Sequence, residues 1–278
     1  MVTLNDYNDD SVAACKCVLV EAFTVLGRHR RYLVLVGGWV PPLLMPDSGH
    51  IGSIDVDLAI DFRQIPAHLY ETIGNDLLRA GYRATDLPNR FEREVKIGNR
   101  TFLVRLDLIT GEYGHPPDGG THDIIQGMPV WRSRGVDVAL DHFLELTVAG
   151  TLPEGGDNEV RVRVAVIAAF LVMKGFALDD RKKEKDAYDI YFCLANYPGG
   201  IDALVKEFQP LMDNGLVRES LGKICGKFRT IDSIGPIWAA QIVQAAGGDY
   251  EFARRDAFER ATALFDALGI KPWSAPSP

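Results

Sequence analysis

The chain has 278 residues, of which 47% are hydrophobic and 24% charged, and its formal net charge is −8. This globular composition suits one large domain or two medium ones. The acidic balance argues against a general nucleic-acid coat protein, because duplex binding depends largely on neutralising phosphates. The polar, acidic start and the absence of a long apolar run predict a soluble, cytoplasmic protein that does not enter a membrane.

Hydrophobic periodicity predicts helices and strands together in the first part of the chain. In chain order, the expected elements are a helix over 9–27, strands over 32–36 and 53–61, a helix over 66–80, an edge strand over 82–86, and hairpins formed by 91–97 with 100–110 and by 138–149 with 159–166. The strand over 32–36 ends in Gly37-Gly38. Because Pro41, Pro42 and Pro46 follow, we expect a long loop between the two first strands.

Two aspartates, Asp55 and Asp57, occupy alternate positions of the second strand. Residues two apart on a strand point to the same face, so both carboxylates would lie within a few ångströms of each other. Like charges that close repel unless a cation lies between them, and Mg²⁺ prefers carboxylate oxygen. The same alternation also describes an edge strand with a solvent-exposed face, so the pattern alone leaves both interpretations open.

A third carboxylate, Asp107, lies in the middle of the strongly apolar strand RTFLVRLDLIT. A buried carboxylate is costly unless it is paired or bound to a metal. We consider an ion pair with Arg105 or another arginine, and a third metal ligand. Seven basic residues gather between Arg79 and Arg105, which predicts either a solvent-exposed charged face or a local basic path.

Residues 111–126 are rich in glycine, proline and histidine and predict a loop. His115, His122 and Asp123 could be considered as metal ligands. Their spacing matches no compact site, and we favour a mobile loop near the substrate.

The second informative stretch, 167–194, contains two helical patterns separated by the charged run DDRKKEK. Lys174 interrupts the apolar residues of the first, and Asp186 and Asp189 lie three apart on the second, where they are neighbours on a helix surface. One interpretation is a solvent-exposed helix–loop–helix with ordinary ion pairs. In the other, Lys174 is a phosphate-binding cation, and Asp189 with Asp186 is its polar partner in the same cleft.

The remaining chain predicts short helices over 201–208, 216–228 and 237–246 and a longer one over 250–268. We therefore expect an α+β fold, with a mixed-sheet domain over 1–155 followed by a mostly helical domain over 156–278.

These motifs resemble a known enzyme superfamily. Gly37-Gly38, the Asp55-Val-Asp57 strand and Asp107 resemble the core of the polymerase-β-type nucleotidyltransferases. Lys174 and the run RKKEKDAYD at 181–189 resemble the signature of the AbiEii-type branch, which includes toxins of type IV toxin–antitoxin systems. The resemblance covers residues 32–194, and its second motif is the more particular. In this superfamily the segment after the glycine pair often forms a short helix.

The resemblance implies a nucleotidyltransferase that moves a nucleoside monophosphate from an NTP to an acceptor hydroxyl, with pyrophosphate as the leaving group. It implies that Asp55, Asp57 and Asp107 bind two Mg²⁺ ions and that Asp107 helps to deprotonate the acceptor. The backbone of Gly37 and Gly38, with Ser53 as a hydroxyl donor, would bind the phosphates. From the helical domain, Lys174 would neutralise phosphate charge and Asp189 would orient it or the acceptor.

Three functional hypotheses follow. By resemblance to the toxins, the acceptor would be RNA, at the 3′ end of tRNA, and a cognate antitoxin protein would be a partner. An enzyme of the same fold could instead modify a small molecule, such as an aminoglycoside-type antibiotic, or a protein hydroxyl. The third hypothesis is a regulatory module that binds nucleotide without chemistry.

Overall fold

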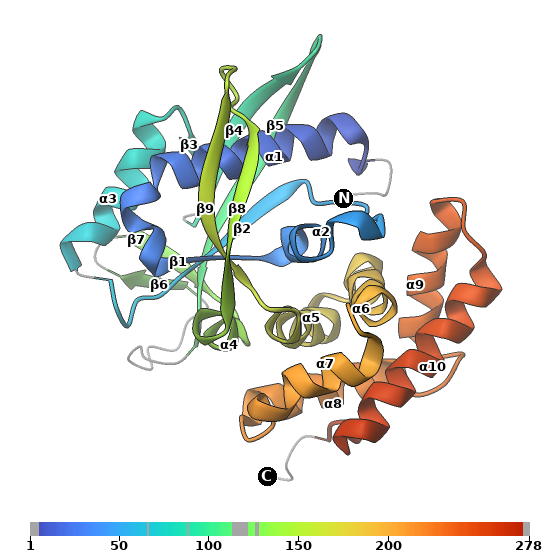
Figure 1. Cartoon of the computed structure of the whole chain (residues 1–278). Coiled ribbons are helices and arrows are strands. Elements are labelled where there is room, and N and C mark those ends of the chain that lie inside the picture. Colours follow the sequence, from blue (N-terminus) through green and yellow to red (C-terminus); the bar gives the residue numbers. More distant parts are fainter. Residues whose placement is uncertain (1–5, 66, 88, 113–121, 126–127, 275–278) are drawn as a thin grey trace. The chain divides into compact units, whose positions relative to one another are not determined.

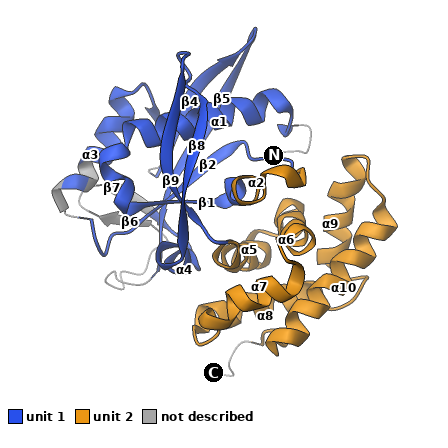
Figure 2. Cartoon of the chain, viewed as in Figure 1, with its two compact units in different colours: residues 1–40, 51–166 blue, residues 41–50, 167–278 orange. Residues whose placement is uncertain are grey.

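The computed structural model describes residues 6–65, 67–87, 89–112, 122–125 and 128–274 (Figure 1). The fold is α+β, with a mixed sheet and a helical C-terminal region, as the sequence predicts. The chain divides into two compact units, coloured in Figure 2. Unit 1 comprises Met1–Val40 and Ile51–Val166, and unit 2 comprises Pro41–His50 and Ile167–Pro278. The boundary falls at Val166 rather than near residue 155. The reason is that the last strand along the chain, residues 157–165, pairs with the first strand, residues 33–36, and so belongs to unit 1.

Unit 1 is built on a sheet with the strand order β3-β4-β5-β2-β1-β9-β8, in which β7 also pairs with β5 and β6 pairs with β7. The described strands are β1 (Leu33–Val36), β2 (Asp55–Ile60), β3 (Arg83–Ala84), β4 (Arg90–Ile97), β5 (Arg100–Thr110), β6 (His122–Ile125), β7 (Met128–Arg132), β8 (Phe143–Thr151) and β9 (Asp157–Ala165). Strand β2 runs parallel to β5 and antiparallel to β1, and β1 runs parallel to β9. The expected strands with Asp55, Asp57 and Asp107 are therefore neighbours in the sheet.

Helix α1 (Asp9–Val25) packs across β4, β5, β8 and β9 and buries an apolar face that includes Leu19 and Phe23. Its first turn is closed by a capping box. Ser11 donates its backbone N–H to Asn8 Oδ1, and Asn8 donates its backbone N–H to Ser11 Oγ. The other described helical segments of unit 1 are η2 (Gly27–Tyr32), η3 (Gly37–Trp39), α3 (Ala67–Arg79) and α4 (Val136–Asp141).

Three segments differ from the prediction. Residues 40–44, expected in a loop, form helix α2 (Val40–Leu44). Pro41 and Pro42 lie in its first turn, where a helix needs no N–H donor. The second hairpin is confirmed from 143 onward, but residues 138–141 belong to α4. Residues 122–125, expected in a loop, form β6 through its pairing with β7.

Unit 2 consists largely of helices. They are α5 (Ile167–Arg181), α6 (Glu184–Asn196), α7 (Gly200–Phe208), α8 (Gly215–Lys227), α9 (Ile234–Ala245) and α10 (Tyr250–Leu268). Helices α5 and α8 approach closely at Gly175, where a Cβ would lie 2.1 Å from Ser220 Oγ. Ser220 Oγ donates to the carbonyl of Val172 at 2.6 Å, which fixes this contact beside Lys174. No described helix has the length and apolar character needed to span a membrane.

Candidate functional site

The turn after β1 lies so close to the side chains of Ser53 and Asp57 that a Cβ would clash with them at two positions. A Cβ on Gly37 would lie 1.9 Å from Asp57 Oδ2, and one on Gly38 would lie 2.5 Å from Ser53 Oγ. Gly37 also has φ +72°, in the left-handed region that favours glycine. Ser53 is buried and donates from Oγ to Asp55 Oδ1 at 2.8 Å. The structure thus brings Gly37, Gly38, Ser53, Asp55 and Asp57 together in unit 1.

The parallel pairing of β2 with β5 places Asp107 beside Asp57 in register. The Asp107 carboxylate is buried and accepts two hydrogen bonds from Arg90, from Nε to Oδ1 and from Nη2 to Oδ2, both at 2.7 Å. The hydrogen bond to Asp107 raises the pKa of Arg90. Burial opposes this rise, and the charges of Asp107, Asp55 and Asp57 add to it. The explanation of Asp107 by an arginine ion pair is confirmed, with Arg90 rather than Arg105 as the partner.

The carboxylates fit a divalent cation only in part. Within the part of the chain that the structure describes, no three His, Cys, Asp or Glu side chains lie close enough together to hold a metal ion. Both oxygens of Asp107 are engaged by Arg90. Asp55 and Asp57 retain the hard oxygen donors that Mg²⁺ prefers, at alternate positions of one strand. Binding by all three carboxylates stays a prediction that requires Asp107 to leave Arg90.

The histidine-rich segment adds little to this site. His115 lies outside the described residues, and for His122 and Asp123 the structure describes only the backbone pairing of β6 with β7. The interpretation of His122 and Asp123 as part of a loop is wrong, because both lie on strand β6, and for His115 the loop stays a prediction.

In unit 2, Lys174 of α5 is buried between two carboxylates of α6. Its Nζ lies 2.7 Å from Asp186 Oδ1 and 2.7 Å from Asp189 Oδ2. Burial lowers the pKa of Lys174, but the charges of Asp186 and Asp189 outweigh burial and raise the pKa above its usual value. These ion pairs are buried rather than exposed to solvent; only the Arg181 partner of Asp186, 2.8 Å away, is half exposed. A buried lysine of this kind is stable because both partners are present.

Two residues that the sequence analysis did not single out also contact Asp189. Lys185 Nζ lies 2.5 Å from Asp189 Oδ1, and His50 donates from Nε2 to the same oxygen at 3.0 Å. Burial raises the pKa of Asp189, but the charges of Lys174 and Lys185 and the hydrogen bond from His50 hold it well below its usual value. Lys185 could have been found from its i, i+4 spacing. His50 is 139 residues from Asp189, and no local pattern indicates it.

The imidazole of His50 is fully buried in unit 2 and packs edge-on against the ring of Phe192, with centroids 4.6 Å apart. Burial lowers the pKa of His50, with Asp189 opposing the shift and Lys185 adding to it. The lowered pKa favours the neutral ring, which donates its Nε2–H to the Asp189 carboxylate. Because His50 follows α2, it ties the segment after Gly38 to helix α6 within unit 2.

The basic segment of unit 1 is compensated by carboxylates. The ion pairs of its six arginines are Arg79–Asp76, Arg83–Glu94, Arg90–Asp107, Arg93–Glu21, Arg100–Asp10 and Arg105–Glu92. Their charges are therefore largely neutralised within unit 1, which weakens the interpretation of this segment as a path for a polyanion.

No known protein-family model matches the chain, and no curated protein sequence matches it significantly. The resemblance to the AbiEii-type nucleotidyltransferases therefore stays a prediction from the motifs. Function is therefore inferred from the residues of the two sites described above.

Proposed function

We propose that the protein is an Mg²⁺-dependent nucleotidyltransferase that moves a nucleoside monophosphate from an NTP to an acceptor hydroxyl. The observation that supports this proposal is the contact of the glycine pair with Asp57 and Ser53. A turn without Cβ atoms lets a phosphate approach backbone N–H groups closely. Here the nearest side chains are a carboxylate and the hydroxyl that holds Asp55, which are the groups that a metal–triphosphate substrate needs beside it.

In this proposal Asp55 and Asp57 hold Mg²⁺, which when bound neutralises the charge that develops on the phosphates. Ser53 fixes the Asp55 carboxylate through its hydrogen bond. The backbone of Gly37 and Gly38 binds the β- and γ-phosphates. Asp107 lies next to Asp57 in register. Once Arg90 releases the Asp107 carboxylate, this carboxylate accepts the proton of the acceptor hydroxyl.

Lys174 and Asp189 have a more demanding role. Asp186 and Asp189 already compensate the positive charge of Lys174, because each has a carboxylate oxygen 2.7 Å from Lys174 Nζ. A phosphate that binds Lys174 therefore has to compete with these two carboxylates. Asp189 would take Lys174 back when the phosphate leaves, with Lys185 and His50 holding the carboxylate in place. The role of these residues in transfer stays a prediction.

The resemblance favours RNA, at the 3′ end of tRNA, as the acceptor, and a cognate antitoxin as a protein partner. One observation favours the second candidate, a small-molecule or protein hydroxyl. The six arginines between Arg79 and Arg105 are ion-paired with carboxylates, which leaves Lys96 as the one basic residue of this segment without an ion pair to a described residue and weakens the case for a basic path to RNA.

The test is transfer of label from each of four α-³²P-labelled NTPs, with Mg²⁺, into total RNA, protein and small-molecule fractions. The variants are Asp55→Asn and Asp57→Asn, and Asp141→Asn is the matched control because its carboxylate is 54% exposed. We expect the first two to lose transfer about a hundredfold or more and the control to retain it. Equal transfer by Asp57→Asn would overturn the proposed chemistry. The fraction that becomes labelled identifies the acceptor. If no fraction is labelled and calorimetry detects no NTP binding, both the enzyme and the nucleotide-binding module are refuted.

A further inference from the structure

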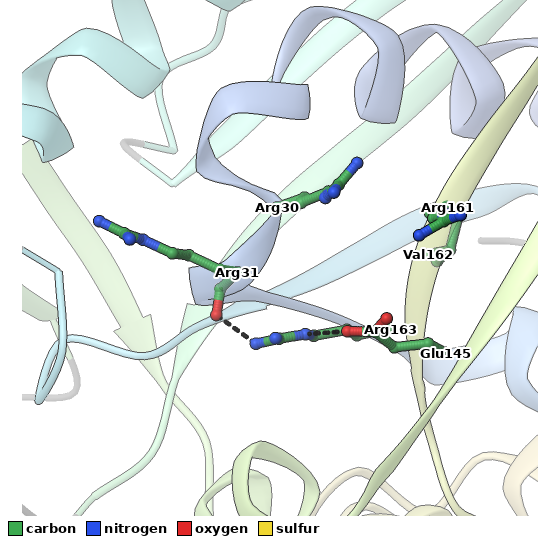
Figure 3. A pocket seen from close by; sticks show the side chains of 6 residues that line it. All are labelled: Arg30, Arg31, Glu145, Arg161, Val162 and Arg163. Carbon is green, nitrogen blue, oxygen red and sulfur yellow. Dashed lines mark hydrogen bonds and ion pairs between the residues drawn. The ribbon is translucent and has the colours of Figure 1, made fainter.

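A small pocket lined by arginines lies in unit 1, apart from the glycine turn. It has a volume of about 150 Å³ and is lined by Arg30, Arg31, Glu145, Arg161, Val162 and Arg163 (Figure 3). Residues of η2, just before β1, form one side, and β9 with its hairpin partner β8 forms the other. Gly37 lies at the opposite end of β1. Gly37 follows Leu33 by four residue steps along an extended strand, which corresponds to roughly 13 Å.

The hairpin is anchored to the start of β1 by Arg163. Its guanidinium donates to the backbone carbonyl of Arg31 and pairs with Glu145 at 3.0 Å, across the β8–β9 ladder. The side chain of Arg31 extends away from the pocket in Figure 3, and its guanidinium lies over the ring of Tyr32, 4.6 Å from the centroid. Arg163 and Glu145 therefore form the floor and compensate each other, and Arg31 contributes mainly its backbone.

Besides the Arg31 guanidinium, which extends away from the pocket, two more guanidinium groups have no ion pair with a described residue. Arg30 and Arg161 are exposed, and neither guanidinium group has an ion pair or hydrogen bond with any residue that the structure describes. Arg161 lies opposite Thr147 on the β8–β9 ladder, where Arg163 has Glu145. Elsewhere in unit 1, arginines such as Arg83 and Arg100 have carboxylate partners. In a chain with a net charge of −8, this pocket therefore carries two positive charges that the fold leaves unbalanced.

We propose that this pocket binds a doubly charged phosphoryl group. Guanidinium groups present several N–H donors in a plane and bind phosphate oxygens with charge-assisted hydrogen bonds. The uncompensated charge of Arg30 and Arg161 matches a dianion. Ligand pockets for larger molecules are about 300–1,000 Å³, so a pocket of this size holds one or two phosphoryl groups and not an entire nucleotide. This site goes beyond the proposed nucleotidyl transfer and does not depend on it.

The ligand's source can be inorganic phosphate, pyrophosphate or the terminal phosphate of a phosphomonoester. Calorimetric titrations of the full chain with sodium phosphate, sodium pyrophosphate and glycerol 1-phosphate distinguish these sources. EDTA in the buffer removes metal-dependent binding at Asp55 and Asp57. The test variant is Arg30→Gln/Arg161→Gln. The matched control is Arg83→Gln/Arg100→Gln, which makes the same charge change at two exposed arginines that have carboxylate partners.

We expect wild-type protein to bind at least one of the three anions. The affinity should fall about tenfold or more in Arg30→Gln/Arg161→Gln and change less than about twofold in the Arg83→Gln/Arg100→Gln control. Binding of the free anions alone assigns the site to phosphate or pyrophosphate, and binding of glycerol 1-phosphate assigns it to a phosphomonoester. No binding by wild type, or an equal loss in both double variants, would overturn the proposal. Either result is independent of the transfer assay.

Discussion

Gly37→Ala tests whether the glycine turn and Asp57 act together, and Gly98→Ala is its matched control. Both glycines have a left-handed φ, +72° and +57°, so alanine costs about 1–2 kcal/mol at either position. A Cβ on Gly98 would meet nothing within 4 Å, whereas one on Gly37 would lie 1.9 Å from Asp57 Oδ2. Because ordinary contact begins at 3.4 Å, the Asp57 carboxylate has to move by about 1.5 Å.

The displaced group is the end of a side chain, so it can rotate away with little additional loss of stability. We therefore expect both variants to lose a similar free energy of unfolding, about 1–2 kcal/mol, in urea denaturation. Their rates should differ, because a misplacement of about 1 Å at a reacting centre costs about a hundredfold in rate. We expect Gly37→Ala to lose transfer to this extent and Gly98→Ala to keep a rate close to wild type.

The assay is the initial rate of label transfer at saturating NTP and Mg²⁺, with binding of Mn²⁺ followed in parallel by electron paramagnetic resonance. Mn²⁺ binding reports on the carboxylates even if the transfer assay does not contain the true acceptor. Equal rates and equal Mn²⁺ affinities in the two variants, at matched stability, would refute the argument that Gly37 and Asp57 form one site.

Three further predictions concern the buried ionic groups. Arg90→Gln should tighten Mn²⁺ binding because it releases the Asp107 carboxylate, and an unchanged affinity in the titration would remove Asp107 from the metal site. Asp189→Asn should lower the free energy of unfolding by about 3 kcal/mol in urea, because Lys174 and Lys185 lose a buried partner; a loss below about 1 kcal/mol would contradict this. The folded-state pKa of Asp189 is depressed, so its stabilisation is present above an unfolded pKa of about 4 and is lost as the pH falls through the folded value. Wild type should therefore lose more stability than Asp189→Asn below about pH 4 in acid titrations, and parallel curves would refute the linkage.

The spacing of apolar residues predicted most of the helices and strands, because this spacing depends on the residues of one segment alone. Helix α10 has the expected bounds, Tyr250–Leu268, since its apolar face repeats at helical spacing. The prediction failed where a local signal has two meanings. Pro41 and Pro42 indicate a loop in most settings, but they also suit the first turn of a helix, and the structure places them there.

Sequence periodicity is enough to predict which side chains share a face. Asp55 and Asp57 follow the two-residue period of a strand, and Lys185 and Asp189 follow the spacing of a helix. Which charges meet depends on strand register and helix packing, because these bring together residues far apart in the chain. Register and packing pair Asp107 with Arg90 and bring His50 into contact with Asp189. The arginines between Arg79 and Arg105 have carboxylate partners, whereas the guanidinium groups of Arg30 and Arg161 have none among the described residues.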